Sequence, residues 1–212
     1  MSKIIFVTGI DTNIGKSYAT GFLAKQYITE GFKTITQKFI QTGNSGISED
    51  IEVHRKLMGT GLLPEDIDGT TCPVVLSYPA SPHLAAKIDN VKIDLDKISN
   101  SIKKLAEKYD VVLIEGAGGI MVPITESYTT LDYIKAHNLP VVVVTAPKLG
   151  SINHTLLTLQ ICKYNHITVE AVAYNKYNIE DNVICNDTEE FIKNYLRKEF
   201  KNSKWLIIPE LK

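Results

Sequence analysis

A glycine-rich loop follows the first apolar segment of the chain and leads directly into an amphipathic stretch. Residues 9–17 read GIDTNIGKS, so that Lys16 and Ser17 come directly after the second glycine. Glycines let backbone N–H groups turn onto phosphate oxygens, the lysine reaches the β- and γ-phosphates, and the hydroxyl ligates Mg²⁺. Ile10 stands where the first glycine of this motif usually does. The loop predicts binding of a nucleoside triphosphate together with Mg²⁺.

Two acidic residues could complete a metal site beside this loop. Glu115 follows an apolar run at residues 111–114, and Gly116, Ala117 and Gly118 continue without bulk, so the chain could lie against phosphates there. Asp50 stands at the start of a predicted helix. The alternatives are a solvated glutamate in a strand-ending turn and an aspartate that only complements the helix dipole.

Lys38 ends a predicted strand beside the expected γ-phosphate, where a lysine could stabilise attacking or transferred oxyanions. An exposed strand-ending lysine is an equal alternative. Two further polar clusters are SPH at residues 81–83 and KLGSINH at residues 148–154. The second cluster opens a helix whose N-terminus could hold a carboxylate. We assign no chemistry to His83 or His154.

The elements that must position these residues alternate between strand and helix. Strands are expected at residues 4–7, 34–38, 111–114, 141–144, 169–173 and 204–208, and helices at 16–30, 49–57, 94–108, 152–164 and 188–199. This alternation predicts one α/β domain over residues 1–212, with a doubly wound, mostly parallel sheet, helices on both faces and the P-loop NTPase architecture. The turn-rich residues 59–82 are interpreted as an insertion at the sheet edge or over the site.

Composition narrows the class of protein. A net charge of −1 and a sequence pI near 6.5 argue against the broad basic face of a nucleic-acid binder. No signal-peptide core and no apolar stretch of membrane-spanning length is found, which predicts a cytoplasmic protein that does not bind membranes. The three cysteines are widely separated and lack metal-binding spacing, so they are expected to be reduced thiols.

The chain resembles the dethiobiotin synthetase family, whose members are ATP-dependent cyclo-ligases of biotin biosynthesis. Four segments carry the resemblance, and together they extend over nearly the whole chain: VTGIDTNIGKS at residues 7–17, SPH at 81–83, EGAGG at 115–119 with Pro123, and KLGSINH at 148–154. The first and last together are specific, whereas EGAGG alone also resembles other amidoligases.

The resemblance implies a reaction and three catalytic residues. The enzyme would close the ureido ring of dethiobiotin from 7,8-diaminopelargonate, CO2 and MgATP by way of a carbamate and a carbamic–phosphoric anhydride. The family lysine that matches Lys38 stabilises the carbamate and the phosphoryl oxygens, and Lys16 neutralises charge on the moving γ-phosphate. Thr12 would line the diamine and the carbamate.

The resemblance also implies three sets of binding residues and a homodimer. The nucleotide would be bound by Asn13, Ile14, Gly15, Lys16, Ser17, Tyr18, Glu115, Gly116, Ala117, Gly118, Asn175, Lys176, Pro209 and Leu211. The small-molecule substrates would be bound by Thr12, Lys38, Thr42, Ser81, Gly150, Ser151, Ile152 and Asn153. Mg²⁺ would be held by Ser17, Asp50 and Glu115. The helix start at residues 150–153 resembles the family element that binds the substrate carboxylate across a homodimer interface.

Two departures from the family pattern and two competing classes complete the interpretation. Phe39 replaces the proline that usually follows the catalytic lysine, and the sequence stops three residues after Pro209, so weak adenine selectivity is expected. The partition and septum-positioning ATPases share the architecture but carry an additional lysine early in the loop, which residues 10–14 lack. Cobyrinic-acid-type amidoligases usually carry a glutaminase domain, for which this chain has no room.

Overall fold

The computed structural model describes residues 2–176 and 181–210. Its strands are β1 (Lys3–Gly9), β2 (Thr34–Lys38), β3 (Gln41–Thr42), β4 (Val75–Leu76), β5 (Val111–Gly119), β6 (Val141–Thr145), β7 (Val169–Asn175) and β8 (Lys204–Ile208). Its helices are α1 (Lys16–Thr29), α2 (Glu49–Met58), α3 (Pro64–Ile67), α4 (Pro82–Ile88), α5 (Leu95–Lys108), α6 (Thr130–Ala136), α7 (Ser151–Tyr164) and α8 (Asn182–Glu199).

Six strands form one parallel sheet in the order β2-β5-β1-β6-β7-β8. The central strands β1, β5 and β6 are buried along most of their length, which explains why their sequences are almost continuously apolar. The chain turns to one side of β1 to form β2 and later to the other side to form β6. Ligand sites of such sheets lie beyond the carboxyl ends of the strands at this switch point, where the glycine-rich loop leaves β1.

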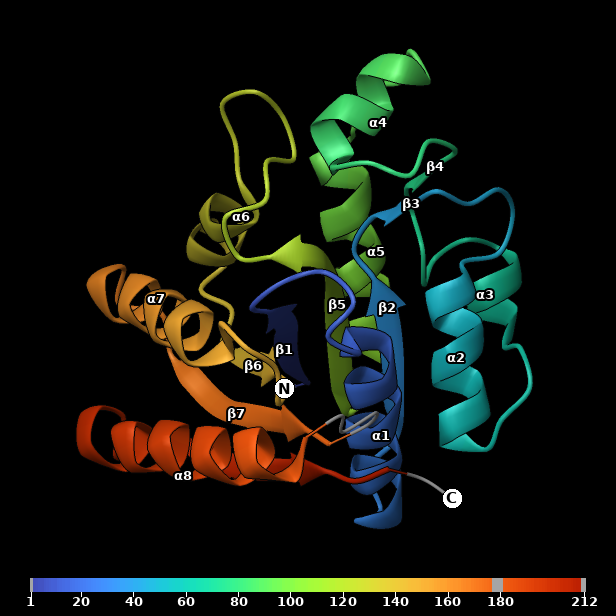
Figure 1. The fold of residues 1–212 in the computed structure, drawn as a ribbon. Helices are drawn as coiled ribbons and strands as arrows, with labels where there is room; N and C mark the ends of the chain where they lie inside the picture. Colours follow the sequence, from blue (N-terminus) through green and yellow to red (C-terminus); the bar gives the residue numbers. More distant parts are fainter. Residues whose placement is uncertain (1, 177–180, 211–212) are drawn as a thin grey trace.

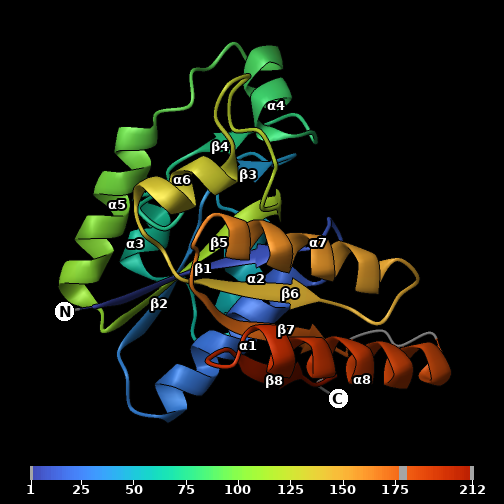
Figure 2. The same cartoon turned by 90° about the vertical axis from the view of Figure 1, so that its left-hand side faces the viewer.

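Helices cover both faces of the sheet, as the sequence predicts. Figures 1 and 2 show α1 and α5 on opposite faces, while α7 and α8 lie side by side at the β6–β8 end. A second, two-stranded parallel sheet of β3 and β4 lies beyond the carboxyl end of β2, below α4 in Figure 1. The turn-rich segment at residues 59–82 thus contributes α3 and β4, and β4 pairs with the segment that follows Lys38.

All six predicted strands of the main sheet and all five predicted helices are confirmed, with three kinds of difference. Strand β5 runs on from the predicted end at residue 114 to Gly119, because it still pairs with β1 through Gly9. The last helix begins at Asn182 rather than residue 188, because the Asp181 side chain accepts hydrogen bonds from the Val183 and Ile184 amides and caps it there. The short elements α3, α4, α6, β3 and β4 were not predicted. Helix α6 begins at a capping box in which Thr129 and Asp132 bond each other's backbone amides.

No helix in the described part of the chain combines the length and apolar character needed to cross a lipid bilayer.

Candidate active site

The loop between β1 and α1 has the backbone conformation that an anion-binding turn needs. Gly15 directly precedes α1 with φ 76°, and Asn13 also has a positive φ of 53°. The Asn175 side-chain amide, from the end of β7, donates a 2.9 Å hydrogen bond to the Ile14 carbonyl. A Cβ on Gly15 would overlap that amide, so both the positive φ and the close approach require glycine here. Amide groups at the start of α1 are thereby free to face a phosphate.

Lys16 is buried at the base of this loop. Its Nζ donates to the Asp11 carbonyl at 2.9 Å, and only 7% of the residue is exposed. Burial lowers the pKa of Lys16 to about 8; the Glu115 carboxylate opposes this shift and the Lys38 ammonium adds to it. A phosphate in the loop would supply the negative charge that this ammonium lacks.

Four side chains from four elements meet where β2 ends beside the middle of β5. Ser17 Oγ of α1 lies 2.7 Å from Asp50 Oδ1 of α2 and 3.0 Å from Glu115 Oε1 of β5, so its one hydroxyl proton can be donated to either carboxylate. Lys38 Nζ of β2 pairs with Asp50 and, at 2.8 Å, with Glu115 Oε1. The same ammonium donates to the Gly116 carbonyl at 3.3 Å. The sequence predicts all four residues as site residues, and the fold brings them into direct contact.

The opposite charges in this cluster shift the pKa values of Lys38 and Glu115. Burial by itself lowers the pKa of Lys38, but the Glu115 and Asp50 carboxylates outweigh it and raise that pKa to about 12. Burial by itself raises the pKa of Glu115, but the Lys38 ammonium and His54 hold it well below its usual range. Lys38 is therefore a cation and Glu115 an anion, although both are almost completely buried.

Phe39, which occupies the family's usual proline position, keeps the backbone beside Lys38 in the sheet. Its N–H donates to the Glu115 carbonyl at 2.8 Å, and the Lys38 N–H donates to the Thr71 carbonyl at 2.7 Å. A proline could not make the first of these bonds. The phenyl ring is fully buried against Phe6 and Tyr133.

A cavity of about 330 Å³ opens over this cluster. It is lined by loop residues 12, 13 and 15–17, by Lys38 and Thr42, by Asp50, and by Glu115, Ala117 and Gly118. Most of the predicted catalytic, phosphate-binding and metal-binding residues therefore share one cavity.

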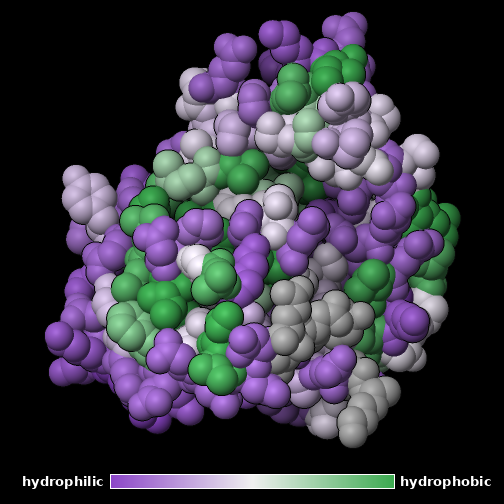
Figure 3. Space-filling view, viewed as in Figure 1, coloured by the Kyte–Doolittle hydropathy of each residue, from purple (hydrophilic) through white to green (hydrophobic). Residues whose placement is uncertain are grey.

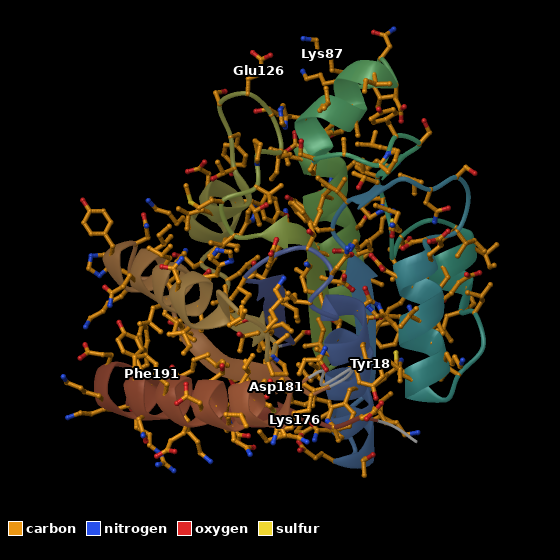
Figure 4. All side chains as sticks on the ribbon, in the orientation of Figure 1. Tyr18, Lys87, Glu126, Lys176, Asp181 and Phe191 are labelled. Carbon is orange, nitrogen blue, oxygen red and sulfur yellow. The ribbon has the colours of Figure 1, made fainter. Side chains whose placement is uncertain are left out.

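Of the residues predicted to bind the nucleotide, Lys176 and Pro209 follow β7 and β8, and Tyr18 of α1 contacts this end of the sheet. The Tyr18 hydroxyl donates to the Pro209 carbonyl at 3.0 Å, and the Lys176 amide donates to the Ile208 carbonyl at 2.9 Å. Figure 4 labels Tyr18 and Lys176 in this region, near the end of the described chain. Leu211, also predicted to bind the nucleotide, lies outside the described residues.

The predicted substrate residues are more dispersed. Thr12 and Thr42 face the cavity, whereas Ser81 and residues 150–153 do not line it. Ser81 precedes α4. Ser151 is fully buried, and its amide donates to the Lys148 carbonyl, which leaves Gly150, Ile152 and Asn153 as the more accessible part of this helix start. These substrate roles stay predictions.

Two contacts at the site were not foreseen from the sequence. Lys148 Nζ lies 3.1 Å from Asp11 Oδ2, so an ion pair joins the loop to the segment before α7. His54 Nε2 lies 2.6 Å from Glu115 Oε2, inside the buried cluster. The available signal for His54 was its spacing, because residues four apart, such as Asp50 and His54, share one face of a helix.

The donor set fits Mg²⁺. Within residues 2–176 and 181–210, no group of three His, Cys, Asp or Glu side chains is arranged to hold a metal alone. Mg²⁺ needs no such cage, since it commonly takes one or two carboxylates, a hydroxyl, water and the phosphates of a bound nucleotide. Ser17, Asp50 and Glu115 offer hard oxygen ligands that already touch one another.

Comparisons with known proteins extend over nearly the whole chain. A protein-family model described as an AAA domain matches residues 3–200. The ATP-dependent dethiobiotin synthetase BioD 2 of Haemophilus ducreyi is 51% identical over 208 residues, which are 98% of this chain and 99% of that protein. The protein of the same name from Pasteurella multocida is 52% identical over 203 residues, 96% of this chain and 95% of that one.

Likeness to solved structures concerns the fold alone. A putative plasmid partition protein from Borrelia burgdorferi B31 has a TM-score of 0.55, 14% identity, and coverage of 100% of this chain and 87% of that chain. The partition ATPases, the competing class from the sequence, thus share the P-loop architecture with this chain. Such low identity carries no argument for a shared activity.

Proposed function

Because the chain belongs to the ATP-dependent dethiobiotin synthetase family, and is thus a ligase of biotin biosynthesis, we propose that the Lys16–Lys38–Glu115 cavity is its catalytic centre. The single observation that supports this most is the position of Lys38. Its ammonium pairs with the two carboxylates that the Ser17 hydroxyl of the phosphate-binding loop also contacts.

The proposed reaction has three steps. One amine of 7,8-diaminopelargonate attacks CO2 and loses a proton, which gives a carbamate. A carbamate oxygen then attacks the γ-phosphorus of ATP, and ADP leaves with the electron pair of the broken P–O bond. Finally the second amine attacks the carbonyl carbon of the mixed anhydride, phosphate leaves, and the ureido ring closes with loss of a proton.

The chain's own residues would supply charge and orientation in these steps. The loop amides and Lys16 would bind and neutralise the γ-phosphate, and Lys38 would stabilise the carbamate and the phosphoryl oxygens. Thr12 and Thr42 line the cavity where the carbamate would lie, and Ser81 is placed in the same substrate set by resemblance alone. Mg²⁺, held by Ser17, Asp50 and Glu115, would supply positive charge to the phosphate oxygens.

We further propose that the base of ATP lies near Asn175, Lys176, Tyr18 and Pro209. The support is their adjacency: Asn175 contacts the loop at Ile14, and Tyr18 and Lys176 both bond the end of β8. Leu211 belongs to this proposed set by resemblance. Gly116 would act through its backbone, whose carbonyl already accepts from Lys38.

A homodimer with the substrate tail bound at the start of α7 is the accompanying proposal. A groove of about 510 Å³ beside the loop is lined partly by Met121, His154 and Leu157, and Met121 and Leu157 are 50% and 57% exposed. Figure 3 shows hydrophobic side chains gathered over the α6 and α7 part of the molecule. Burying this face against a second copy would bring residues 150–153 of one chain toward the cavity of the other.

We also propose that the chain is one cytoplasmic domain. All three cysteines are free, as expected in a reducing compartment, and the buried hydrophobic residues of the strands and helices form one core cluster.

The direct test is product formation. Purified protein with diaminopelargonate, bicarbonate and Mg²⁺ should form dethiobiotin when ATP is supplied, with GTP and CTP run in parallel to measure base selectivity. Folded, ATP-binding protein that formed no dethiobiotin would refute the proposal. Sedimentation at assay concentration tests the dimer, and a fully active monomer would contradict it.

A further inference from the structure

His54 is a buried imidazole that the proposed chemistry does not use. The residue is fully buried in α2, and its Nε2 lies 2.6 Å from Glu115 Oε2. Its other ring nitrogen, Nδ1, has no hydrogen-bond partner among the described residues. A proton on Nε2 fits both observations, because Nε2 then donates to the carboxylate while Nδ1 needs no acceptor.

The Glu115 carboxylate divides its two oxygens between different partners. Oε1 accepts from Ser17 Oγ at 3.0 Å and from Lys38 Nζ at 2.8 Å. Oε2 contacts His54 Nε2 at 2.6 Å. The imidazole thus determines which oxygen faces the cavity and which faces the helix α2.

The close packing of α2 against α1 places His54 within reach of Glu115. Helix α2 crosses α1 at Gly21, where an added Cβ would lie 3.0 Å from the His54 Cα and still closer to the Leu57 side chain. Any larger residue at this position would push α2 outward and carry the imidazole away from β5. His54 and Asp50 are four residues apart on α2, so the same helix placement sets both groups against the cluster.

We propose that His54 is a positioning residue, which holds the Glu115 carboxylate in one rotamer so that Oε1 alone is presented to Ser17, Lys38 and the bound divalent cation. This role rests on the proposed function of Glu115 as a metal ligand. Without the imidazole, Oε2 loses its donor in a buried site, and the carboxylate can turn to satisfy both oxygens on the Lys38 side. Groups that orient a metal ligand in this way change metal affinity or activity by roughly 10–100-fold when removed.

The test compares two substitutions at one position. His54→Gln keeps an N–H donor at nearly the reach of Nε2, whereas His54→Leu keeps the volume and removes the donor. Mn²⁺ affinity, measured by electron paramagnetic resonance with a non-hydrolysable ATP analogue bound, should weaken about 10-fold or more in His54→Leu and recover largely in His54→Gln. Nucleotide affinity in EDTA should stay within a few-fold, and the metal dependence of turnover should shift through KM for Mg²⁺ more than through kcat.

A matched control is His166→Gln, an exposed histidine in the turn before β7, which should leave Mn²⁺ affinity unchanged. If His54→Leu fails to fold, histidine-labelled wild-type protein still tests the role by NMR, where His54 Nε2 should carry the proton that is donated to Glu115. The inference is overturned by wild-type Mn²⁺ affinity in His54→Leu, by equal weakening in both variants, or by an Nε2 that carries no proton. These readouts need no dethiobiotin, so failure of the proposed reaction and failure of this role are separable.

Discussion

Replacing Lys38 with alanine should change stability, metal response and turnover together. Its ammonium pairs with Asp50 and Glu115, whose side chains are 25% and 1% exposed, and its own side chain is 6% exposed. Lys38→Ala therefore leaves a buried carboxylate without its cation. Breaking a buried pair costs about 3–5 kcal/mol, and we expect the lower end, about 3 kcal/mol, because Ser17 and His54 still donate to Glu115.

The same change should make stability depend on Mg²⁺. At this chain length a loss of about 3 kcal/mol lowers the Tm by roughly 6–12 °C. An ion bound to the freed carboxylates would restore about 2.7 kcal/mol when present at about 100 times its dissociation constant. Thermal unfolding of wild type and Lys38→Ala should therefore be compared with and without Mg²⁺, and the variant should respond more strongly.

Turnover should fall even where stability is restored. Removing one preorganised charge from a developing oxyanion costs about 10²–10³-fold in kcat, while ATP binding should stay largely intact because Lys16 and the loop amides remain. Lys163→Ala, which removes an exposed ion pair with Glu199, is the control and should show neither effect. Wild-type turnover in Lys38→Ala would refute the charge role, and a Tm insensitive to Mg²⁺ would refute the pairing argument.

Three further predictions concern stability and reactivity. The pKa of Lys38 is raised from 10.5 to about 12, so the charged lysine stabilises the folded protein fully below pH 10.5 and loses this effect as the pH rises through 12. The difference in unfolding free energy between wild type and Lys38→Ala should therefore become smaller over that pH range. Asp66→Asn should cost about 3–5 kcal/mol in denaturant unfolding, because Asp66 takes two hydrogen bonds from the buried Arg55; a loss below about 1 kcal/mol would contradict this. Burial raises the pKa of Cys72 to about 11, so its thiol should react with an alkylating reagent at about pH 8 far more slowly in the native protein than in denaturant, as mass spectrometry can measure; equal rates would count against it.

The parts of the fold that were predictable from the sequence have local signals. The continuous β-branched run of β6 predicts a strand, and the glycine-rich loop before α1 predicts a helix start. Both predictions are correct and need no knowledge of which elements pack nearby. Short elements such as α3, four residues long, offer too few residues for a period to be recognised. The missed start of α6 had a local signal, since Thr129 and Asp132 form a capping box that the sequence spells out.

The residues of the site also differ in whether a local sequence signal identifies them. Lys38 and Glu115 could be identified because Lys38 ends one recognisable strand and Glu115 directly follows the apolar run of another, and parallel strands place their carboxyl ends at one edge. The contact between His54 and Glu115 joins residues 61 apart and depends on the close crossing of α1 and α2 at Gly21. The sequence pattern of α2 does not predict how closely this helix packs against α1. The sequence could therefore show only that His54 shares a helix face with Asp50.

The charge balance of the cluster connects its structure to its proposed work. Lys16 and Lys38 carry the positive charge, and Asp50 and Glu115 carry the negative charge, so the four buried or half-buried groups compensate one another before any ligand arrives. MgATP brings a Mg²⁺ ion, which binds preferentially to the carboxylates. It also brings phosphates, which bind preferentially to the lysines. Ligand binding can then exchange partners without leaving a buried charge unpaired. Lys38, whose ammonium contacts the two carboxylates and the Gly116 carbonyl, is the cation that this exchange would release toward the carbamate.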